Sequence, residues 1–194
     1  CSDATRAEVE KTCTALRQEV DVRAGALHEV RVRAAHDLVE RVTEALRFLD
    51  MPKVRMEVRV ANMAPGENGA DDVEFLIATN PGEPVQPLAR IASGGELSRV
   101  MLALKCVLGD REGTGVMIFD EVDTGVSGKA AQKIGYRLRR VSRGTQVICI
   151  THSAQIAALA DTHLLVSKET RDGRAETAVC ALGEEQRTYE IARI

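Results

Sequence analysis

The first fifty residues have the hydrophobic spacing of one long helix. From residue 3 to about residue 50 there is no proline and only one glycine, Gly25. Apolar or small side chains recur in steps of three and four at Val9, Cys13, Leu16, Val20, Leu27, Val30 and Ala34. A second stripe follows at Leu38, Val42, Ala45, Leu46 and Leu49. The first stripe is typical of a coiled-coil seam and the second of a helix on a globular core, an ordinary amphipathic surface helix being the alternative.

The segment after the helix alternates in the way of strands and turns. Met51-Pro52 ends the helix, and alternating apolar and charged residues over 54–60 predict a half-buried strand. Residues 61–72 have the composition of a loop. A second strand is expected over 73–79, before a turn at Asn80-Pro81-Gly82.

From residue 93 onward, helical patterns alternate with apolar runs. Helices are expected over 93–109, 127–143, 153–160 and from about 184. Strands are expected over 115–120, 146–151, 163–168 and 174–182. The runs GVMIFD and QVICIT are apolar nearly throughout, which is typical of strands buried on both faces. The alternation predicts an α/β fold with a partly parallel sheet, in which 1–50 is a helix and 51–194 a globular lobe.

Composition narrows the classes of protein. Of the 194 residues, 44% are hydrophobic and 28% charged, which is a globular profile. Aromatic residues make up 3%, too few for a surface that stacks single-stranded bases. The net charge of −3 argues against a broad basic surface for DNA. Over residues 1–60, 11 basic residues balance 11 acidic ones, which favours a partner helix.

The cysteines and the apolar runs bear on the cellular compartment. The five cysteines are Cys1, Cys13, Cys106, Cys149 and Cys180. None forms a C-x-x-C pair, so we expect free thiols rather than zinc or a disulfide framework. No run approaches the ~20 apolar residues of a membrane span, and no secretory signal opens the chain. We therefore expect a cytoplasmic protein, and the missing initiator methionine suggests a piece of a larger one.

Two acids follow the apolar run 116–119. A strand ending at Asp120 would place its carboxylate where α/β sheets bind ligands, and there it can hold a nucleotide-bound Mg²⁺ through water. The adjacent Glu121 can orient and polarise an attacking water. Alone this Walker B pattern is weak, since two solvated acids at a strand end would look the same.

The segment Ser93-Gly94-Gly95-Glu96-Leu97-Ser98-Arg99 is more specific. Two glycines ahead of a helix allow a ligand to approach the backbone, where free N–H groups and the helix dipole favour a phosphate. Ser93 and Glu96 also fit a capping box, which needs no ligand. Capping does not explain the glycine pair, because glycine in a first turn costs stability.

Neighbouring motifs add one candidate and exclude another. Lys129 follows Gly128, but a phosphate-binding Walker A loop would need a glycine where Asp123 stands and a hydroxyl residue where Ala130 stands. No other stretch fits that loop. His152 follows the expected strand 146–151 and is well placed for a phosphate. The remaining histidines, His28, His36 and His163, are interpreted as structural.

Together, in this order, the motifs S-G-G-E-L-S-R, I-F-D-E-V-D-T-G-V-S-G and I-T-H resemble the C-terminal lobe of ABC-type ATPases of the SMC-like class. Within that class, four segments look like RecN-type DNA repair proteins: Thr124–Gly128, Thr79–Gly82, Pro87–Ser93 and Val166–Lys168. Ser153 and Ala154 depart from the Leu-Pro that is commoner after the histidine. The D-loop Asp of the wider class falls at Ser127.

The resemblance implies a division of roles. Asp120 would serve Mg²⁺, Glu121 would activate water and His152 would sense the γ-phosphate of ATP. The nucleotide-binding residues would be Ser93, Gly94, Gly95, Glu96 and Asp123, with the first three closing over the ATP of a second, identical head. The segment Asp123–Ser127 would couple the two sites, and 1–50 would be the returning helix of a coiled coil.

The resemblance also implies partners and a setting. A separate N-terminal lobe would supply Walker A, so the chain alone should not turn over ATP. The other implied partners are DNA at double-strand break ends and a recombinase, in the cytoplasm of a bacterium and associated with the nucleoid. The alternatives are another SMC-like or transporter-type ATPase head, or a non-catalytic coiled-coil interaction module with an ATPase-like fold.

Overall fold

The computed structural model describes residues 3–91, 93–109, 115–171 and 174–194. The chain divides into two compact units: unit 1 is Cys1–Glu44 with Lys53–Arg90, and unit 2 is Ala45–Pro52 with Ile91–Ile194. The boundaries of these units differ from the expected ones, which were a helix over 1–50 and a lobe over 51–194. The difference arises because the strands after the long helix group with that helix rather than with the later α/β elements.

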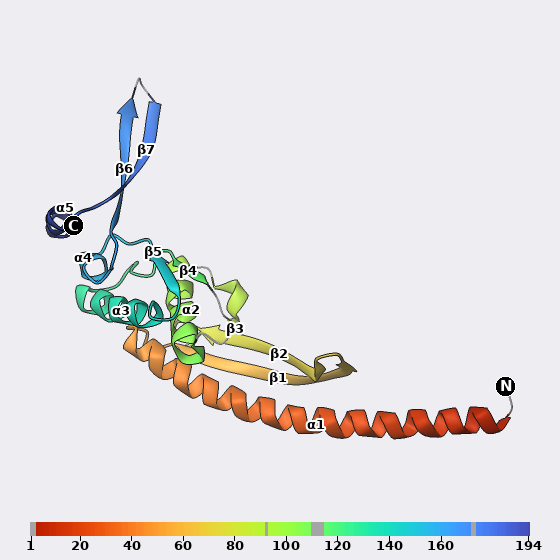
Figure 1. The fold of residues 1–194 in the computed structure, drawn as a ribbon. Coiled ribbons are helices and arrows are strands. Elements are labelled where there is room, and N and C mark those ends of the chain that lie inside the picture. Colours follow the sequence, from red (N-terminus) through yellow and green to blue (C-terminus); the bar gives the residue numbers. More distant parts are fainter. Residues whose placement is uncertain (1–2, 92, 110–114, 172–173) are drawn as a thin grey trace. The chain divides into compact units, whose positions relative to one another are not determined.

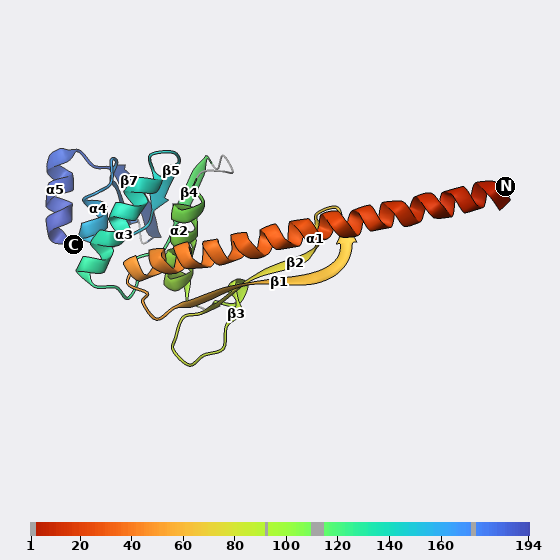
Figure 2. The ribbon, with the colours of Figure 1, turned by 90° about the horizontal axis from the view of Figure 1, so that it is seen from below.

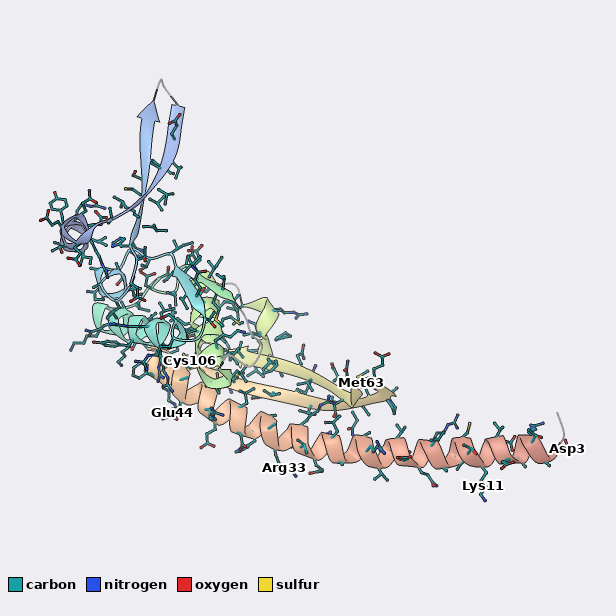
Figure 3. All side chains as sticks on the ribbon, in the orientation of Figure 1. Asp3, Lys11, Arg33, Glu44, Met63 and Cys106 are labelled. Carbon is teal, nitrogen blue, oxygen red and sulfur yellow. The ribbon has the colours of Figure 1, made fainter. Side chains whose placement is uncertain are left out.

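The long helix is present as predicted. Helix α1 spans Asp3–Phe48, and the chain leaves it just before Pro52. Three apolar side chains of its first half are exposed: Val9 by 57%, Leu16 by 56% and Val20 by 45%. Lys11 projects from the same stretch, away from the strands of unit 1 (Figure 3). The predicted seam is therefore open along this part of the helix, and a coiled-coil partner for it stays a prediction.

A long antiparallel hairpin accompanies α1 in unit 1. Strand β1 spans Arg55–Gly66 and β2 spans Gly69–Ala78, and the short β3, Gln86–Pro87, pairs with β2 to give the order β1-β2-β3. A one-turn 3₁₀ helix, η1, follows at Leu88–Arg90. The hairpin runs beside α1 in both ribbon views (Figures 1 and 2).

The expectation of a loop over 61–72 is wrong. The two strands continue through this segment, with Asn62 opposite Asp71, and only the two residues after Gly66 form the turn. Pro65 lies in β1, an edge strand, within the stretch between Asn62 and Gly66 where the pairing register shifts, and proline in sheets is confined to such places. Gly69 has φ +97°, a conformation that costs glycine little. The composition of a loop here belongs to a solvent-exposed hairpin tip.

A buried carboxylate joins the hairpin to α1. The Nδ1 atom of His28 lies 2.6 Å from Asp71 Oδ1, and Arg31 Nη1 donates to Asp71 Oδ2 at 2.9 Å. Arg31 also donates to the carbonyl of Asn68 at 2.6 Å. The Asp71 side chain is only 1% exposed, and hydrogen bonds from Arg31 and then His28 lower its pKa. His28 is thus a structural residue, as expected.

Unit 2 contains the predicted α/β elements. Its helices are α2 (Gly94–Leu108), α3 (Gly128–Val141), α4 (Ala154–Ala157) and α5 (Glu184–Arg193). Its strands are β4 (Val116–Phe119), β5 (Gln146–Cys149), β6 (Leu164–Arg171) and β7 (Arg174–Ala181). Strands β4 and β5 are parallel, and β6 and β7 form an antiparallel hairpin. The parallel pair confirms the predicted fold class.

Helices surround the core of unit 2. The largest fully buried side chains in this unit are Leu46, Leu49, Val100, Leu102, Val122 and Ile134. Helix α3 packs against both α2 and α4 (Figure 2). Burying one such side chain stabilises the fold by roughly 1.5–3 kcal/mol. Arg187 of α5 donates to the carbonyl of Ala157, the last residue of α4, at 3.2 Å and to that of the C-cap residue Ala158 at 3.0 Å, and so holds the end of α4.

Strands β4 and β5 are buried on one face only. Met117 and Phe119 are buried, as the apolar run predicted. The alternating side chains are exposed: Val116 by 47%, Ile118 by 65%, Ile148 by 43% and Ile150 by 56%. Burial on both faces is therefore wrong for this chain, because helices cover just one side of the pair.

Candidate functional site

Two of the predicted motifs meet where helix α2 begins. Ser93 is the N-cap of α2, and its Oγ accepts a hydrogen bond from the backbone N–H of Glu96 at 3.4 Å. This is the serine half of the predicted capping box. Ser93 and Gly94 are exposed, while Gly95 is buried. The helix start therefore presents its first residues to solvent and packs the third against its own chain.

The glycine pair makes room for the acids that follow β4. A Cβ on Gly94 would lie 2.6 Å from Oε2 of Glu121. A Cβ on Gly95 would lie 2.8 Å from the carbonyl of Glu121 and 3.1 Å from Cβ of Thr124. The close approach that the sequence predicted thus occurs within the chain itself, and contact with a ligand at these glycines stays a prediction.

Two side chains of α2 fix the segment after β4. Ser98 Oγ donates to the carbonyl of Asp120 at 2.6 Å. Arg99 Nη1 donates to the carbonyls of Thr124 at 3.0 Å and Val122 at 3.4 Å. Arg99 is 8% exposed, and burial is the main cause that lowers its pKa. The carbonyls of this segment are therefore held by α2 on both sides of Glu121.

Sequence reasoning did not assign a role to Arg99. A usable signal existed, because Arg99 falls at the buried helical spacing of Gly95, Leu102 and Ala103. An arginine on the core side of a helix needs buried acceptors. Its acceptors are backbone carbonyls distant in sequence, which local spacing does not reveal.

The two acids after β4 differ in backbone geometry. Asp120 continues directly from the strand and is exposed. Glu121 is also exposed and has φ +56°, in the left-handed region that non-glycine residues rarely adopt. Its carbonyl accepts from the N–H of Thr124 at 3.0 Å, which closes a turn. This turn directs Glu121 toward the start of α2, and such strained positions cluster at functional sites.

Asp123 is turned inward and links the ends of two strands. Thr151 Oγ1 donates to Asp123 Oδ2 at 2.5 Å, and the N–H of Ser153 donates to Thr151 Oγ1 at 3.0 Å. Nδ1 of His152 lies 3.8 Å from the same Asp123 oxygen. The Asp123 side chain is 2% exposed and that of His152 80%. Asp123 thus positions the loop that carries His152, while the histidine ring itself faces solvent.

Negative charge collects at this edge. Burial raises the pKa of the Cys149 thiol to about 12, and the carboxylates of Asp123 and Asp120 raise it further in the same direction. Cys149 ends β5, beside Phe119 of β4. The edge therefore favours an incoming cation over an anion as long as both carboxylates are ionised.

The residues present fit a shared rather than a complete metal site. Among the described residues, no group of three or more His, Cys, Asp and Glu side chains is placed to hold a metal ion. Mg²⁺ is commonly bound by one or two carboxylates together with waters and substrate phosphates. Asp120 offers an exposed carboxylate of that kind at a strand end. The carboxylate of Asp120 is thus a suitable ligand for a Mg²⁺ ion that is also bound by the phosphates of a nucleotide.

The end of the second motif forms a helix cap. Ser127 Oγ accepts from the N–H of Ala130 at 3.4 Å and is the N-cap of α3. In the wider class an Asp stands at this position, by the resemblance given above. Here the serine starts a helix, and its contribution to coupling two nucleotide sites stays a prediction.

Comparison with known proteins agrees with the motifs. The chain is 48% identical over 192 residues to the DNA repair protein RecN of Halalkalibacterium halodurans, an alignment that covers 96% of this chain and 34% of the relative. It is 39% identical over 196 residues to the DNA repair protein RecN of Vibrio cholerae, covering 100% of this chain and 35% of the relative. The chain is RecN-type. It spans about a third of the length of these RecN relatives, and no family model matches it.

The solved structures most useful for the fold are SMC heads. The RecN-type chain superposes on the Smc head domain with coiled coil and joint from Pyrococcus yayanosii with a TM-score of 0.66 at 20% identity, over 98% of this chain and 35% of that one. A second Smc head, from Pyrococcus furiosus, gives a TM-score of 0.60 at 20% identity. These likenesses show that the chain has the fold of part of an Smc head domain. No helix in the described ranges is long and apolar enough to cross a membrane.

Proposed function

We propose that this chain is the C-terminal part of an ATP-binding and ATP-hydrolysing head in a RecN-like DNA repair protein. The observation that carries the proposal is a series of contacts at one edge of unit 2. Gly94 and Gly95 lie against Glu121, and Asp123, two residues later, contacts the loop that carries His152. Relatives with 39–48% identity bear the name DNA repair protein RecN. Three motifs brought together by long-range contacts are stronger support than any one of them.

Each residue of this edge has a role that its surroundings permit. Glu121 is exposed and held in a fixed turn, so its carboxylate can orient and deprotonate an attacking water. Asp120 can accept a metal ion, which when bound with ATP would neutralise charge that develops on the phosphates. His152 faces solvent on a loop anchored by Asp123, and can donate to a phosphate oxygen. Ser93 and the first N–H groups of α2 form a phosphate-binding helix start.

A partner lobe is needed to bind the phosphates of ATP. The sequence has no Walker A loop. The exposed isoleucines Ile118 of β4 and Ile148 of β5, which lie opposite each other, leave one face of the parallel pair uncovered. An N-terminal lobe of the same protein would cover this apolar face and supply the loop. We therefore expect no measurable ATP turnover by the chain alone.

The remaining parts of the proposal concern the assembly. Two heads would dimerise around two ATP molecules, with the α2 start of each head closing over the nucleotide of the other, and hydrolysis would release them. The work of the machine would be the repair of double-strand breaks by recombination in a bacterium, at the nucleoid, with a recombinase as a further partner. The alternatives are another SMC-like head, or a non-catalytic interaction module with an ATPase-like fold.

The test is a reconstitution. The chain is mixed with a separately expressed N-terminal lobe, and ATP hydrolysis is measured for wild type and for Glu121→Gln. Activity that arises only in the mixture and is lost in the variant supports the split site. Activity of the chain alone contradicts the assignment of the phosphate grip to a partner. A folded but inert mixture favours the non-catalytic module.

A further inference from the structure

Helix α3 has a surface of one charge sign. Between Asp123 and Asp161 the sequence contains no Asp or Glu. The same stretch has six basic residues: Lys129, Lys133, Arg137, Arg139, Arg140 and Arg143. This stretch is therefore strongly positive inside a chain whose net charge is −3.

The positive side chains share the exposed side of the helix. The buried residues of α3 are Ala130, Ala131, Ile134, Gly135 and Leu138. At 100° per residue these lie on one side, and Lys129, Lys133 and Arg140 fall on the opposite side. Arg139 flanks that side, and Arg143 lies in the turn that follows α3; both are also exposed. Charge thus fills the solvent face, on which only Gln132 and Tyr136 are uncharged.

Nothing in the described part of the chain neutralises this face. Lys133 and Arg137 lie over the ring of Phe48, at 5.5 Å and 4.4 Å from its centroid, which orients them without cancelling their charge. The other four, Lys129, Arg139, Arg140 and Arg143, have no ion pair with any described residue. We call these four the α3 basic face.

We propose that the α3 basic face binds the phosphate backbone of double-stranded DNA. The inference rests on the proposed function and names the surface that it leaves unspecified. From Lys129 to Arg140 the helix rises about 17 Å, and a duplex presents about one phosphate charge per 1.7 Å of its axis. Several phosphates therefore lie within reach of the face at once, and contacts of this kind are independent of base sequence.

The face suits a duplex better than a protein or a single strand. Protein interfaces have apolar anchors at the centre and few lysines, whereas the one exposed aromatic side chain on α3 is Tyr136. Binding of single strands relies on several stacking aromatics. Lysine and arginine side chains around a single aromatic residue suit the regularly spaced phosphates of a duplex.

The test uses the chain mixed with the N-terminal lobe, because that is the assembly proposed to work. The four residues of the α3 basic face are changed to glutamine together: Lys129→Gln, Arg139→Gln, Arg140→Gln and Arg143→Gln. The matched control removes the same charge from exposed positions elsewhere: Lys11→Gln, Arg17→Gln, Arg33→Gln and Lys53→Gln. Binding to a fluorescent duplex is followed by anisotropy over a range of salt concentrations, with thermal unfolding and ATP hydrolysis measured in parallel.

The expected result is a selective loss. Each lost phosphate contact lowers the slope of log affinity against log salt by about 1, so the α3 variant should lose roughly 3 to 4 in slope and more than ten-fold in affinity near 0.1 M salt. Unfolding, ATP hydrolysis and the control variant should match wild type. Equal binding by the α3 variant and wild type overturns the inference while leaving the proposed ATPase intact. Equal losses of duplex affinity in the α3 variant and the control variant also overturn the inference, because binding would then depend on the total charge of the chain rather than on this face. A wild-type mixture that hydrolyses ATP but binds no duplex overturns both the inference and the DNA part of the proposed function.

Discussion

Thr151 donates a hydrogen bond to Asp123, and this bond ties together the loops that follow two neighbouring parallel strands. The two residues are 28 positions apart in sequence. Thr151 also accepts from the N–H of Ser153, so one hydroxyl orders both sides of His152. The position of the histidine therefore depends on Thr151, a member of the I-T-H motif to which the sequence analysis gave no role of its own.

Replacing this hydroxyl should loosen the loop. Thr151→Val keeps the shape of the side chain but leaves a buried Asp123 oxygen without its donor, which should cost about 1–3 kcal/mol of unfolding free energy. Denaturant unfolding measures the loss. Thr151→Ser, which retains the hydroxyl, is the control and should stay within about 1 kcal/mol of wild type. A valine variant as stable as wild type would mean that the bond does not hold the loop.

The two glycines of the α2 start should respond differently to alanine. In Gly95→Ala the new Cβ meets the Glu121 backbone and Thr124, which have little freedom, so about 1–3 kcal/mol of stability should be lost. In Gly94→Ala it meets only the end of the flexible Glu121 side chain, so stability should change by less than about 1 kcal/mol.

ATP hydrolysis should be sensitive to Gly94→Ala even though stability is not. By moving the Glu121 carboxylate, Gly94→Ala should lower ATP hydrolysis in the reconstituted mixture by up to about a hundred-fold, since small misplacements of reacting groups are costly. Unfolding and hydrolysis are measured on the same samples. A Gly94→Ala variant with full activity would remove the argument that this glycine makes room for a working Glu121.

The sequence predicted what depends on near neighbours. Pro52 and Gly109 set the ends of α1 and α2 within a few residues, and the parallel strands follow from the order of apolar runs. The hairpin over 61–72 was missed because glycine, proline and asparagine at an exposed tip look like a loop. The exposure of Ile118 was missed because an apolar run does not say how many of its faces a single chain covers.

The sequence predicted which residues belong to the site but not the contacts that fix their positions. Its motif residues lie along one edge, but the side chains that fix them, Arg99 and Thr151, act across long sequence separations. Charge was misjudged for a related reason. A net charge of −3 averages over the chain and conceals a helix whose exposed side carries only positive charges.

The carboxylate of Asp71 should make the stability of unit 1 fall at acidic pH. Hydrogen bonds from Arg31 and His28 place its folded pKa below the ordinary 3.8, so the ionised form stabilises the fold at all pH values above the unfolded pKa. This contribution is lost as the pH falls from about 4 through the folded pKa. Asp71→Asn should therefore be less stable than wild type at pH 7, and the gap should narrow below pH 4. Denaturant midpoints across this range test it, and a gap that does not change with pH would contradict the ion-pair account.

The thiol of Cys149 should react slowly with alkylating reagents, and its rate of alkylation should depend on the charge of the acids beside it. With a pKa of about 12 instead of the ordinary 9.0, its thiolate fraction at pH 8 is smaller by about a thousand-fold, so iodoacetamide should label it far more slowly than the exposed Cys13. Asp120→Asn removes one of the two charges that raise the pKa, and labelling of Cys149 should speed up, while labelling of Cys13 should not change. Mass spectrometry of the alkylated peptides gives both rates from one sample. Because burial is the larger cause of the shift, the variant should recover only part of the rate, and no acceleration at all would mean that the field of Asp120 does not reach the end of β5.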